Sequence, residues 1–498
     1  MRRVRPADEQ GIALVLTLGI LLATSFVLVS VIQFSSSAGR GAQWSRTEQV
    51  AYALAEAGVN NAMSVLANPT NNALNSTLLP SRTTPYEQGS VTWSGTFNPL
   101  NARWTLTSIG SVRNPTGPTA APVSRRIVAQ VDVVPTLSQP LNSQAWNYIY
   151  SRLQPGQSIV PGVCNMTLQQ TVAINSPVLV QGNLCLQNSA SLLKGPIVVG
   201  GSITMTDGNT IGTPTTKVSS VAVGAGCSKS NPNSASQNPC TGGAAVKIYA
   251  DAVFPTAPTI PPPTVDWPGW YANANPGPYY PCTTVSGTPP QFESGDQGVL
   301  PNIDQTKRNN SIGSVVDLTP STSYSCHTVG GELTWNATTK VLTVNGTMYI
   351  DGSAKIENGS VNSYEGFATI YLSGTLLIKN SSMCAVISAG ACSTASWTSN
   401  SRMLVFVVGG NGSNPGHQSQ TGAGNSILLN SARFQGALYA TYGIDIATTS
   451  NSDGPLDGAP VKVGQSVAST WPAFTVVPAG MPGNPVAYAE PQAPVYEG

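Results

Sequence analysis

Charged side chains are scarce in this chain of 498 residues. Asp, Glu, Lys and Arg together make up 9% of it, and the formal net charge is +1. A protein that binds nucleic acid through the phosphates needs a basic surface that displaces counterions. The composition therefore predicts no nucleic-acid partner. Its 49 Gly and 39 Pro, beside 41% hydrophobic residues, favour a β-rich protein of many short strands and turns.

Histidine is almost absent, and the usual metal-binding spacings are missing. Only His327 and His417 occur, and no two cysteines are spaced as CxxC. Zinc sites in proteins are built from clustered Cys and His ligands. We therefore predict no metal site and no cofactor. Asp453 and Asp457 in the segment NSDGPLDG could offer oxygen ligands to Ca²⁺, but a solvated turn is the simpler interpretation.

Eight cysteines are present, all of them far from the N-terminus. An even number in an exported protein predicts disulfides, although the sequence alone leaves many pairings open. Sequential pairing is the simplest. It gives Cys164–Cys185, Cys227–Cys240, Cys282–Cys326 and Cys384–Cys392.

The longest apolar run lies close to the N-terminus. Residues 12–34 carry no charge, and as a helix they would extend for about 34 Å, enough to cross a hydrocarbon core of about 30 Å. Arg2, Arg3 and Arg5 precede this run, which places the N-terminus in the cytoplasm. The run is longer than the apolar part of a cleaved signal peptide. The sequence predicts a single-pass inner-membrane helix, in contact with lipid, and an ectodomain outside the cytoplasm.

A second helix is expected at residues 47–67, TEQVAYALAEAGVNNAMSVLA. Thr47 is a candidate cap for its start. We expect Val50, Leu54, Ala57 and Val65 to form its apolar face.

Together these features carry a resemblance to a known family. A short basic leader (residues 1–11) ending in Gly11, a long apolar helix and an amphipathic helix containing AEAG resemble the minor subunits of type IV pili and the pseudopilins of type II secretion. Residues 104–112 and 124–134 alternate polar and apolar side chains, as half-buried antiparallel strands do. They are similar to the small sheet that pilins pack on their helix. The resemblance covers residues 1–137.

The resemblance implies a processing site and a set of partners. A prepilin peptidase would cut between Gly11 and Ile12, and the released helix would pack among other pilin-like subunits. Leu16 stands where major pilins carry a Glu, which favours a tip or initiating position in a filament. An anchor that is never cut is the competing interpretation.

Beyond a Pro-containing hinge near residue 138, one pattern recurs in which apolar residues alternate on both sides of a Gly. Copies are centred on Gly182, Gly201, Gly346 and Gly374, and a looser copy contains Gly443. Gly182 and Gly201 are 19 residues apart, a spacing typical of single coils of a solenoid. We predict a right-handed parallel β-helix over residues 138–480, with a β-sandwich as the alternative.

The same pattern predicts which side chains face the interior of the coils. We expect Thr375 and Leu377 to point outward. The residues expected to share one interior are Val180, Leu184, Ile203, Val344, Met348, Leu372 and Leu376.

Two segments do not fit the pattern. Residues 252–300 are too rich in Pro to pair inside a sheet, so we expect a long excursion, and residues 481–498 are expected to form an extended tail. Aromatic residues crowd the excursion; they are candidates to stack on a glycan, or else to pin the segment onto the body. These residues are Trp267, Trp270, Tyr271, Tyr279 and Tyr280.

Two functions of different classes follow. The first is a non-enzymatic surface protein, a minor or tip pilin-like subunit that displays a β-helix for structural or adhesive use and has a surface glycan or a host or cell-surface ligand as candidate partner. The second is a membrane-tethered β-helix polysaccharide lyase or hydrolase. Such lyases need an acidic Ca²⁺ site beside a basic residue, and no close cluster of three carboxylates occurs in residues 141–480. The sequence favours the first and predicts no catalytic residue.

Overall fold

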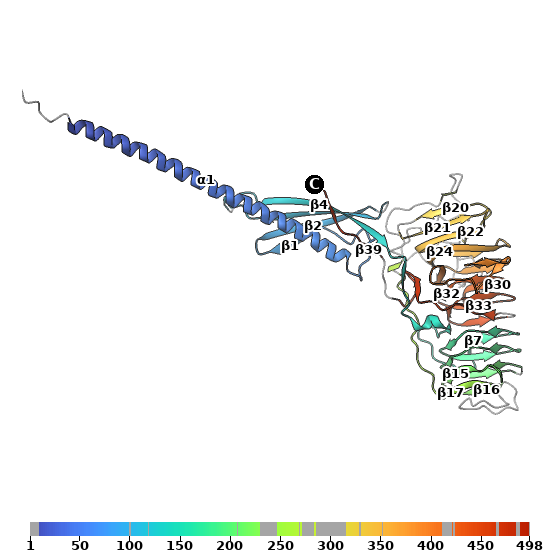
Figure 1. Ribbon diagram of the computed structural model, residues 1–498. Helices are drawn as coiled ribbons and strands as arrows, with labels where there is room; N and C mark the ends of the chain where they lie inside the picture. The colour runs from blue at the N-terminus through green and yellow to red at the C-terminus, as the bar shows by residue number, and fades with distance from the viewer. Residues whose placement is uncertain are drawn as a thin grey trace, which may run out of the picture.

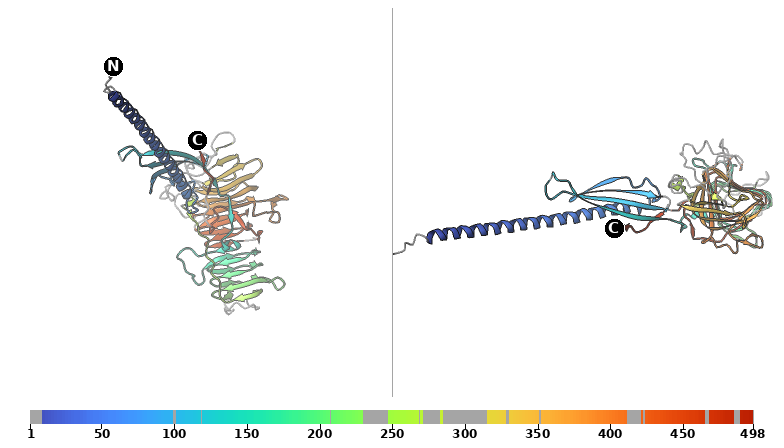
Figure 2. Two further views of the ribbon diagram at one scale, coloured as in Figure 1. Left: turned by 60° about the vertical axis from the view of Figure 1, so that its left-hand side comes forward. Right: turned by 90° about the horizontal axis from the view of Figure 1, so that it is seen from above.

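The molecule is mainly β, with a single long helix at its N-terminal end (Figure 1). The computed structural model describes residues 9–98, 101–117, 119–206, 208–229, 247–267, 269–270, 283–284, 315–327, 330–350, 352–410, 421, 424–464, 468–484 and 489–497. The views in Figures 1 and 2 agree on three parts in a row: a bare helical stem, a small antiparallel sheet beside the end of the helix, and a tall stack of short strands beyond the sheet.

The stem and the second predicted helix are one helix, α1 (Glu9–Leu66). We expected a separate second helix that begins at Thr47, with Thr47 as its cap. Instead, the Thr47 hydroxyl donates to the carbonyl oxygen of Gln43, one turn earlier, at 2.8 Å. Residues 35–46 contain no Pro, so every backbone N–H can keep its helical partner and the helix continues.

The C-terminal third of α1 packs on an antiparallel sheet. The strands are β1 (Arg82–Tyr86), β2 (Gly89–Asn98), β3 (Arg103–Val112) and β4 (Val123–Pro135), paired in that order. The sheet includes both segments predicted from alternation. The face of α1 that is buried against the sheet differs from the predicted apolar face by a rotation of about one residue around the helix axis. It consists of Ala51, Leu54, Ala55, Val59, Ala62 and Leu66.

Small residues decide that rotation. Gly58, from the AEAG segment, lies against Ser108 and Val91, and a Cβ at Gly58 would collide with both. Gly110 on β3 lies in the same way against the backbone of Ala51. Gly58 on the helix and Gly110 on the sheet let the two elements approach closely, so the side of the helix that carries small residues is buried, and Val50 and Ala57 lie half-buried beside it.

The stack of strands is a parallel β-helix, in which each strand pairs in parallel with the strand one coil away. We call it the solenoid and divide it into two blocks. The first block comprises β6 (Ile149–Ser151), β7 (Cys164–Leu168), β8 (Ala173–Ile174), β9 (Val178–Val180), β10 (Asn183–Leu186), β11 (Ser191–Leu192), β12 (Ile197–Val199), β13 (Ile203–Met205), β14 (Thr210–Ile211), β15 (Val218–Val223), β16 (Cys227–Lys229) and β17 (Ala250–Phe254).

The second block follows the Pro-rich segment. It comprises β19 (Val315–Asp317), β22 (Val341–Ile350), β23 (Ser353–Ile356), β24 (Val361–Leu372), β25 (Leu376–Lys379), β26 (Ser382–Cys384), β29 (Met403–Val408), β30 (Asn425–Asn430), β31 (Arg433–Gln435), β32 (Ala437–Ala440), β33 (Gly443–Ile446), β34 (Asn451–Asp453), β35 (Leu456–Gly458), β36 (Val461–Val463) and β37 (Ala468–Ser469). Short antiparallel strands accompany this block: β18 (Thr283–Thr284), β20 (Tyr324–His327) and β21 (Gly331–Asn336) beside β22, and β27 (Ile387–Ser388) with β28 (Ala391–Cys392). The ladders rule out the β-sandwich, whose strands would be antiparallel. The right-handedness expected from the sequence stays a prediction.

The coils are not stacked in the order in which they occur in the chain. The first coil (β6, β7 and β8) lies in the middle of the stack and pairs on one side with the last coil (β35, β36 and β37). From this middle position the first block winds to one end. The second block begins at the other end and winds back to the middle (Figure 1). We call the junction between first and last coils the seam.

The interior of the solenoid is one continuous apolar core, and all seven residues predicted to share it are among its buried members. Two details of the prediction were wrong. Thr375 does not point outward, since it sits buried at a corner with its backbone N–H on the Ser353 hydroxyl at 3.0 Å. Gly346 is not a corner but an irregular point inside the long strand β22, with φ at 72°. That coil turns later, at Gly352.

The Pro-rich segment begins later than predicted, because residues 252–254 belong to β17. Its described part runs along the side of the stack. The Tyr150 hydroxyl in the first coil donates to the carbonyl oxygen of Ile260 at 2.7 Å, and Trp267 contacts Tyr371 in the second block. This segment carries the chain from one block toward the other.

The solenoid is inserted into the antiparallel sheet. The chain leaves β4, passes β5 (Ser138–Pro140) and the 3₁₀ turn η1 (Gln144–Asn147), and enters the solenoid at its middle. It leaves near the same place through β38 (Val476–Pro478), which pairs with β5. The segment expected as an extended tail is extended, but it returns to β4 as β39 (Ala489–Pro491) and β40 (Val495–Tyr496).

Candidate functional site

The processing site predicted at Gly11 and Ile12 lies in the first turns of α1, which begins at Glu9. Residues 1–8 of the basic leader lie outside the described residues. Cleavage at Gly11 therefore remains a prediction.

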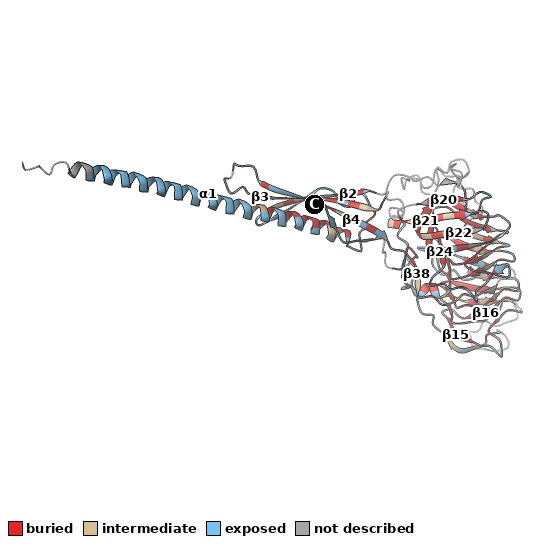
Figure 3. Ribbon diagram, turned by 45° about the horizontal axis from the view of Figure 1, so that its top comes forward, coloured by how far each residue is buried: buried red, intermediate tan, exposed pale blue. Residues whose placement is uncertain are grey.

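The apolar part of α1 has no protein surface to bury it. From Ala13 onward α1 is long and apolar enough to cross a membrane, and the apolar stretch has no buried residue (Figure 3). Leu14 is 71% exposed and Phe34 is 76% exposed. An apolar surface of this extent needs a lipid or protein partner.

Two disulfides of the solenoid lie entirely within the described residues. Cys164 on β7 is joined to Cys185 on the next coil, with 5.7 Å between their Cα atoms, and Cys384 is joined to Cys392. These are two of the four pairs given by sequential pairing. Cys227 and Cys326 are also disulfide-bonded. Their predicted partners, Cys240 and Cys282, lie outside the described residues.

The two carboxylates considered for Ca²⁺ are paired with arginines instead. Asp453 accepts from Arg433 Nε at 2.7 Å, and Asp457 accepts from Arg152 Nε at 2.6 Å. Burial raises the pKa of each carboxyl to about 6, and the neighbouring guanidinium only partly opposes this rise. Among the described residues there is no group of three or more His, Cys, Asp or Glu side chains that could hold a metal ion.

The described aromatic residues of the Pro-rich segment serve packing. Trp270 is 4% exposed and stacks on Tyr371 with 6.0 Å between ring centroids. Trp267 meets Tyr371 edge-on at 5.3 Å. A ring as covered as that of Trp270 is not available to a glycan. The other three candidates, Tyr271, Tyr279 and Tyr280, lie outside the described residues.

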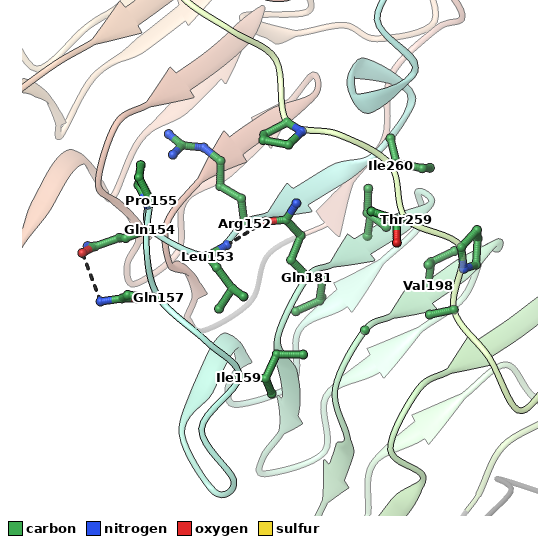
Figure 4. A pocket seen from close by; sticks show the side chains of 16 residues that line it. Arg152, Leu153, Gln154, Pro155, Gln157, Ile159, Gln181, Val198, Thr259 and Ile260 are labelled. Atoms are coloured by element: carbon green, nitrogen blue, oxygen red, sulfur yellow. Dashed lines mark hydrogen bonds between the residues drawn. The ribbon is translucent and has the colours of Figure 1, made fainter.

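A groove with a volume of 580 Å³ opens on the side of the first block (Figure 4). Its floor is the outer face of β9 and β12, with Leu179 and Val198. One wall is the loop at residues 152–159, and the other is the Pro-rich segment at residues 257–262. The segment covers most of these outward apolar side chains, which explains why β9 is buried on both faces and reads as a continuous apolar run.

Amide groups supply the polarity of the groove. Gln181 Oε1 accepts from the backbone N–H of Leu153 at 3.0 Å, and Gln157 donates to Gln154 at 3.3 Å. Arg152 is the charged residue in its lining, and its guanidinium is already held by Asp457 and by the carbonyl oxygen of Ala440. Leu179 and Val198 are only 2% and 5% exposed, so the groove offers amides and the exposed side chain of Ile159, and its lining holds no acid–base pair.

Sequence reasoning missed both the groove and the Arg152–Asp457 pair. The two residues are separated by 305 positions, and their contact exists only because the first and last coils meet at the seam. A weak signal was present, since a lone Arg inside an uncharged, strand-forming stretch needs a buried acidic partner.

Comparisons with known proteins add little. No family model and no curated protein matches the chain. Among solved structures it is similar to the competence-associated pilin ComZ from Thermus thermophilus, with 15% identity and a TM-score of 0.38 over 91% of this chain and 96% of that one. A similarity this weak leaves the class to be defined by the chain's own geometry. That class is a protein with a half-bare N-terminal helix, a small sheet packed on the helix, and a large β domain inserted into the sheet.

Proposed function

We propose that this chain is a pilin-like subunit of a type IV filament, in a minor or tip position, that displays the solenoid outside the cell. In this proposal α1 anchors the chain in the inner membrane with its N-terminus in the cytoplasm. A prepilin peptidase removes the leader after Gly11, and the freed helix packs among other pilin-like subunits. The solenoid serves a structural or adhesive purpose, with a surface glycan or a host or cell-surface ligand as partner.

One observation carries the proposal: a single helix is bare and apolar in its first part and buried against an antiparallel sheet in its last part. The bare part suits lipid at first and a bundle of equivalent helices later, since both remove apolar surface from water. The buried part fixes the sheet and the solenoid to the stem. Leu16 brings no charge into such a bundle, consistent with a position at its end.

Processing tests the proposal directly. Coexpression with a prepilin peptidase is expected to give a mature chain that begins at Ile12, read by N-terminal sequencing. Gly11→Val is expected to block the cut. Gly19→Val is the matched control, because Gly19 lies in the same helix with open space around it and its replacement should leave the cut intact. A chain that keeps Met1, or one cut near Ala38, would contradict the proposal.

The enzymatic alternative receives no support from the described residues. A lyase of the kind considered above needs carboxylates that bind Ca²⁺ beside a free base. Asp453 pairs with Arg433 and Asp457 pairs with Arg152, so neither carboxylate is open to Ca²⁺. Burial also raises the pKa of both carboxyl groups. The groove in Figure 4 supports the adhesive purpose instead, because it is lined by amides and apolar side chains.

A further inference from the structure

A second cavity, with a volume of 520 Å³, lies where the sheet comes closest to the apolar stretch of α1. It is lined by Arg40, Gly41, Gln43 and Trp44 on α1, and by residues 115–116 in the loop that joins β3 to β4. Gly41 leaves the space open because it has no side chain to fill it.

The position of this cavity along α1 places it at the membrane surface if the apolar run spans the bilayer, as in the proposed function. Arg40 follows Phe34, the last residue of that run, by six residues, which is about 9 Å along the helix. Side chains on a helix lean toward its N-terminus, so Arg40 and Trp44 lean toward the membrane. The headgroup layer occupies roughly the first 5–8 Å beyond the hydrocarbon core, within reach of an arginine.

The charge around the cavity is mainly positive. The end of the sheet domain nearest the apolar run carries five arginines and two acidic residues, Glu48 and, in the turn between β1 and β2, Glu87. Glu48 is neutralised by Arg125 at 2.5 Å. Arg40, Arg46 and Arg113 make no ion pair with any described residue. The other arginine of the five is Arg126.

Trp44 is held in a fixed orientation at the cavity. Its indole N–H donates to Glu48 Oε1 at 3.0 Å, and the side chain remains 40% exposed. A half-exposed indole with a satisfied N–H suits the interface between water and lipid. The cavity therefore offers a cation, an amide, a hydroxyl and an aromatic ring together, the groups that a phosphate with a polar glycerol tail would contact.

We propose that this cavity binds the headgroup of an anionic glycerophospholipid in the outer leaflet of the membrane that α1 crosses. Arg40 meets the phosphate, and Gln43 meets the glycerol hydroxyls. The Thr116 hydroxyl donates to Asn114 Oδ1 at 2.7 Å, so its oxygen accepts from a glycerol hydroxyl. Bound in this way, the lipid holds the tip of the β3–β4 loop on the membrane surface and sets the tilt of the sheet domain before the subunit leaves the bilayer.

The test uses the full chain in lipid nanodiscs, with a nitroxide at Thr119→Cys, an exposed position in the same loop but outside the cavity lining. Accessibility of the nitroxide to a water-soluble nickel chelate is measured while phosphatidylglycerol replaces phosphatidylcholine. We expect protection to rise with the phosphatidylglycerol fraction. With Arg40→Gln, half-maximal protection should require an about fivefold higher fraction of phosphatidylglycerol. A factor of this size is the usual effect of one basic residue at a membrane surface.

Arg126→Gln is the matched control, because it removes the same charge from an exposed position on β4 that does not line the cavity. Its midpoint should stay close to that of the unsubstituted chain. An equal effect of both substitutions would mean general surface electrostatics and overturn the site. Equal protection by inorganic phosphate in pure phosphatidylcholine would assign the cavity to a soluble anion and overturn the lipid proposal.

Two further outcomes separate this inference from the proposed function. If the chain inserts into nanodiscs but protection is independent of lipid charge, the headgroup site is wrong and the anchor stands. If the chain does not insert at all, the anchor in the proposed function is wrong. A third outcome is that Arg40→Gln abolishes association between copies of the chain but leaves protection of the nitroxide by phosphatidylglycerol unchanged. The cavity would then be a contact between subunits, and the inference would be overturned.

Discussion

Asp453 is a carboxyl group that folding removes from water. Its side chain is fully buried between Arg433 and Asn451, and burial raises its pKa from 3.8 to about 6. The folded chain therefore keeps the proton of Asp453 up to about pH 6, whereas the unfolded chain loses it near pH 4. A proton held more tightly by the folded state stabilises it at low pH, and this stabilisation is lost as pH rises through the folded pKa.

We therefore predict that the contribution of Asp453 to the free energy of unfolding falls between about pH 4 and about pH 6, by up to roughly 3 kcal/mol. Denaturant titrations of the full chain and of Asp453→Asn in nonionic detergent, compared at each pH, separate the contribution of Asp453 to the free energy of unfolding from that of Asp457. Asp453→Asn should become more favourable, relative to the unsubstituted chain, as pH rises. A difference that stays constant, or that moves the other way, would mean that the ion pair with Arg433 outweighs burial.

The seam is the element-scale feature with the clearest energetic signature. Arg152 from the first coil reaches Asp457 in the last coil, and both side chains are almost fully buried. Removing one member of a buried pair strands the charge of the other, which usually costs about 3–5 kcal/mol. We predict a loss of this size for Arg152→Met, and recovery of most of it when Asp457→Asn is added. Denaturant midpoints of the four chains in the double-mutant cycle measure the coupling.

A second ion pair in the solenoid provides the control. Lys462 on β36 meets Asp445 on β33 at 3.4 Å, and its side chain is half exposed. Lys462→Met should change the free energy of unfolding by less than about 1 kcal/mol, because exposed pairs contribute little. If both substitutions had the same small effect, the seam would not be a buried junction.

Local patterns in the sequence predicted the elements well, but not their order in space. Alternation around Gly182 and Gly201 predicted strands that turn at a glycine and stack in coils, since that alternation is set by neighbouring residues. The same reasoning failed at Thr375, because a corner residue is buried by the neighbouring coil and not by its own strand. Alternation along one strand cannot predict a contact with another coil.

The position of the first coil in the middle of the stack was beyond reach for a similar reason. Each coil has two equivalent ladder edges, and nothing within residues 149–174 indicates which later segment covers the free one. The partners, residues 456–469, occur about 300 positions later. The return of the tail to β4 was missed because β39 and β40 are only three and two residues long and β39 contains Pro, and such segments are usually predicted as loops.

At the scale of the whole molecule, two connections join the solenoid to the antiparallel sheet. One is the covalent path out of β4, and the other is the tail, whose strands pair with β4 and whose Glu497 accepts from Gln130 at 2.5 Å. Both reach the solenoid near its middle. The sheet and the solenoid have separate apolar cores, and the tail contacts both of them, with Met481 in the solenoid core and Ala489 against the sheet core.

We predict that replacing residues 489–497 by a Gly/Ser segment of equal length releases the tail from β4 without unfolding the sheet or the solenoid. Backbone amides of β4 that face the tail should exchange with solvent roughly tenfold faster or more, because two short strands no longer protect them. Peptides covering β29 and the buried face of α1 should keep their exchange rates. Hydrogen exchange followed by mass spectrometry measures all three, and faster exchange throughout the solenoid would show that the tail stabilises the coils themselves.

The seam also determines when the solenoid can be completed during synthesis and export. The first coil emerges about 300 residues before the coil that covers its open ladder edge. At ~5–20 residues per second, that edge stays unpaired for roughly 15–60 s. An unpaired edge of this kind can join a strand of another chain. Short strands such as β6 and β8, with three and two residues, offer few backbone groups to such a chain. We expect the short strands to limit such pairing until the last coil emerges; the longest strand at that edge, β7, has five residues.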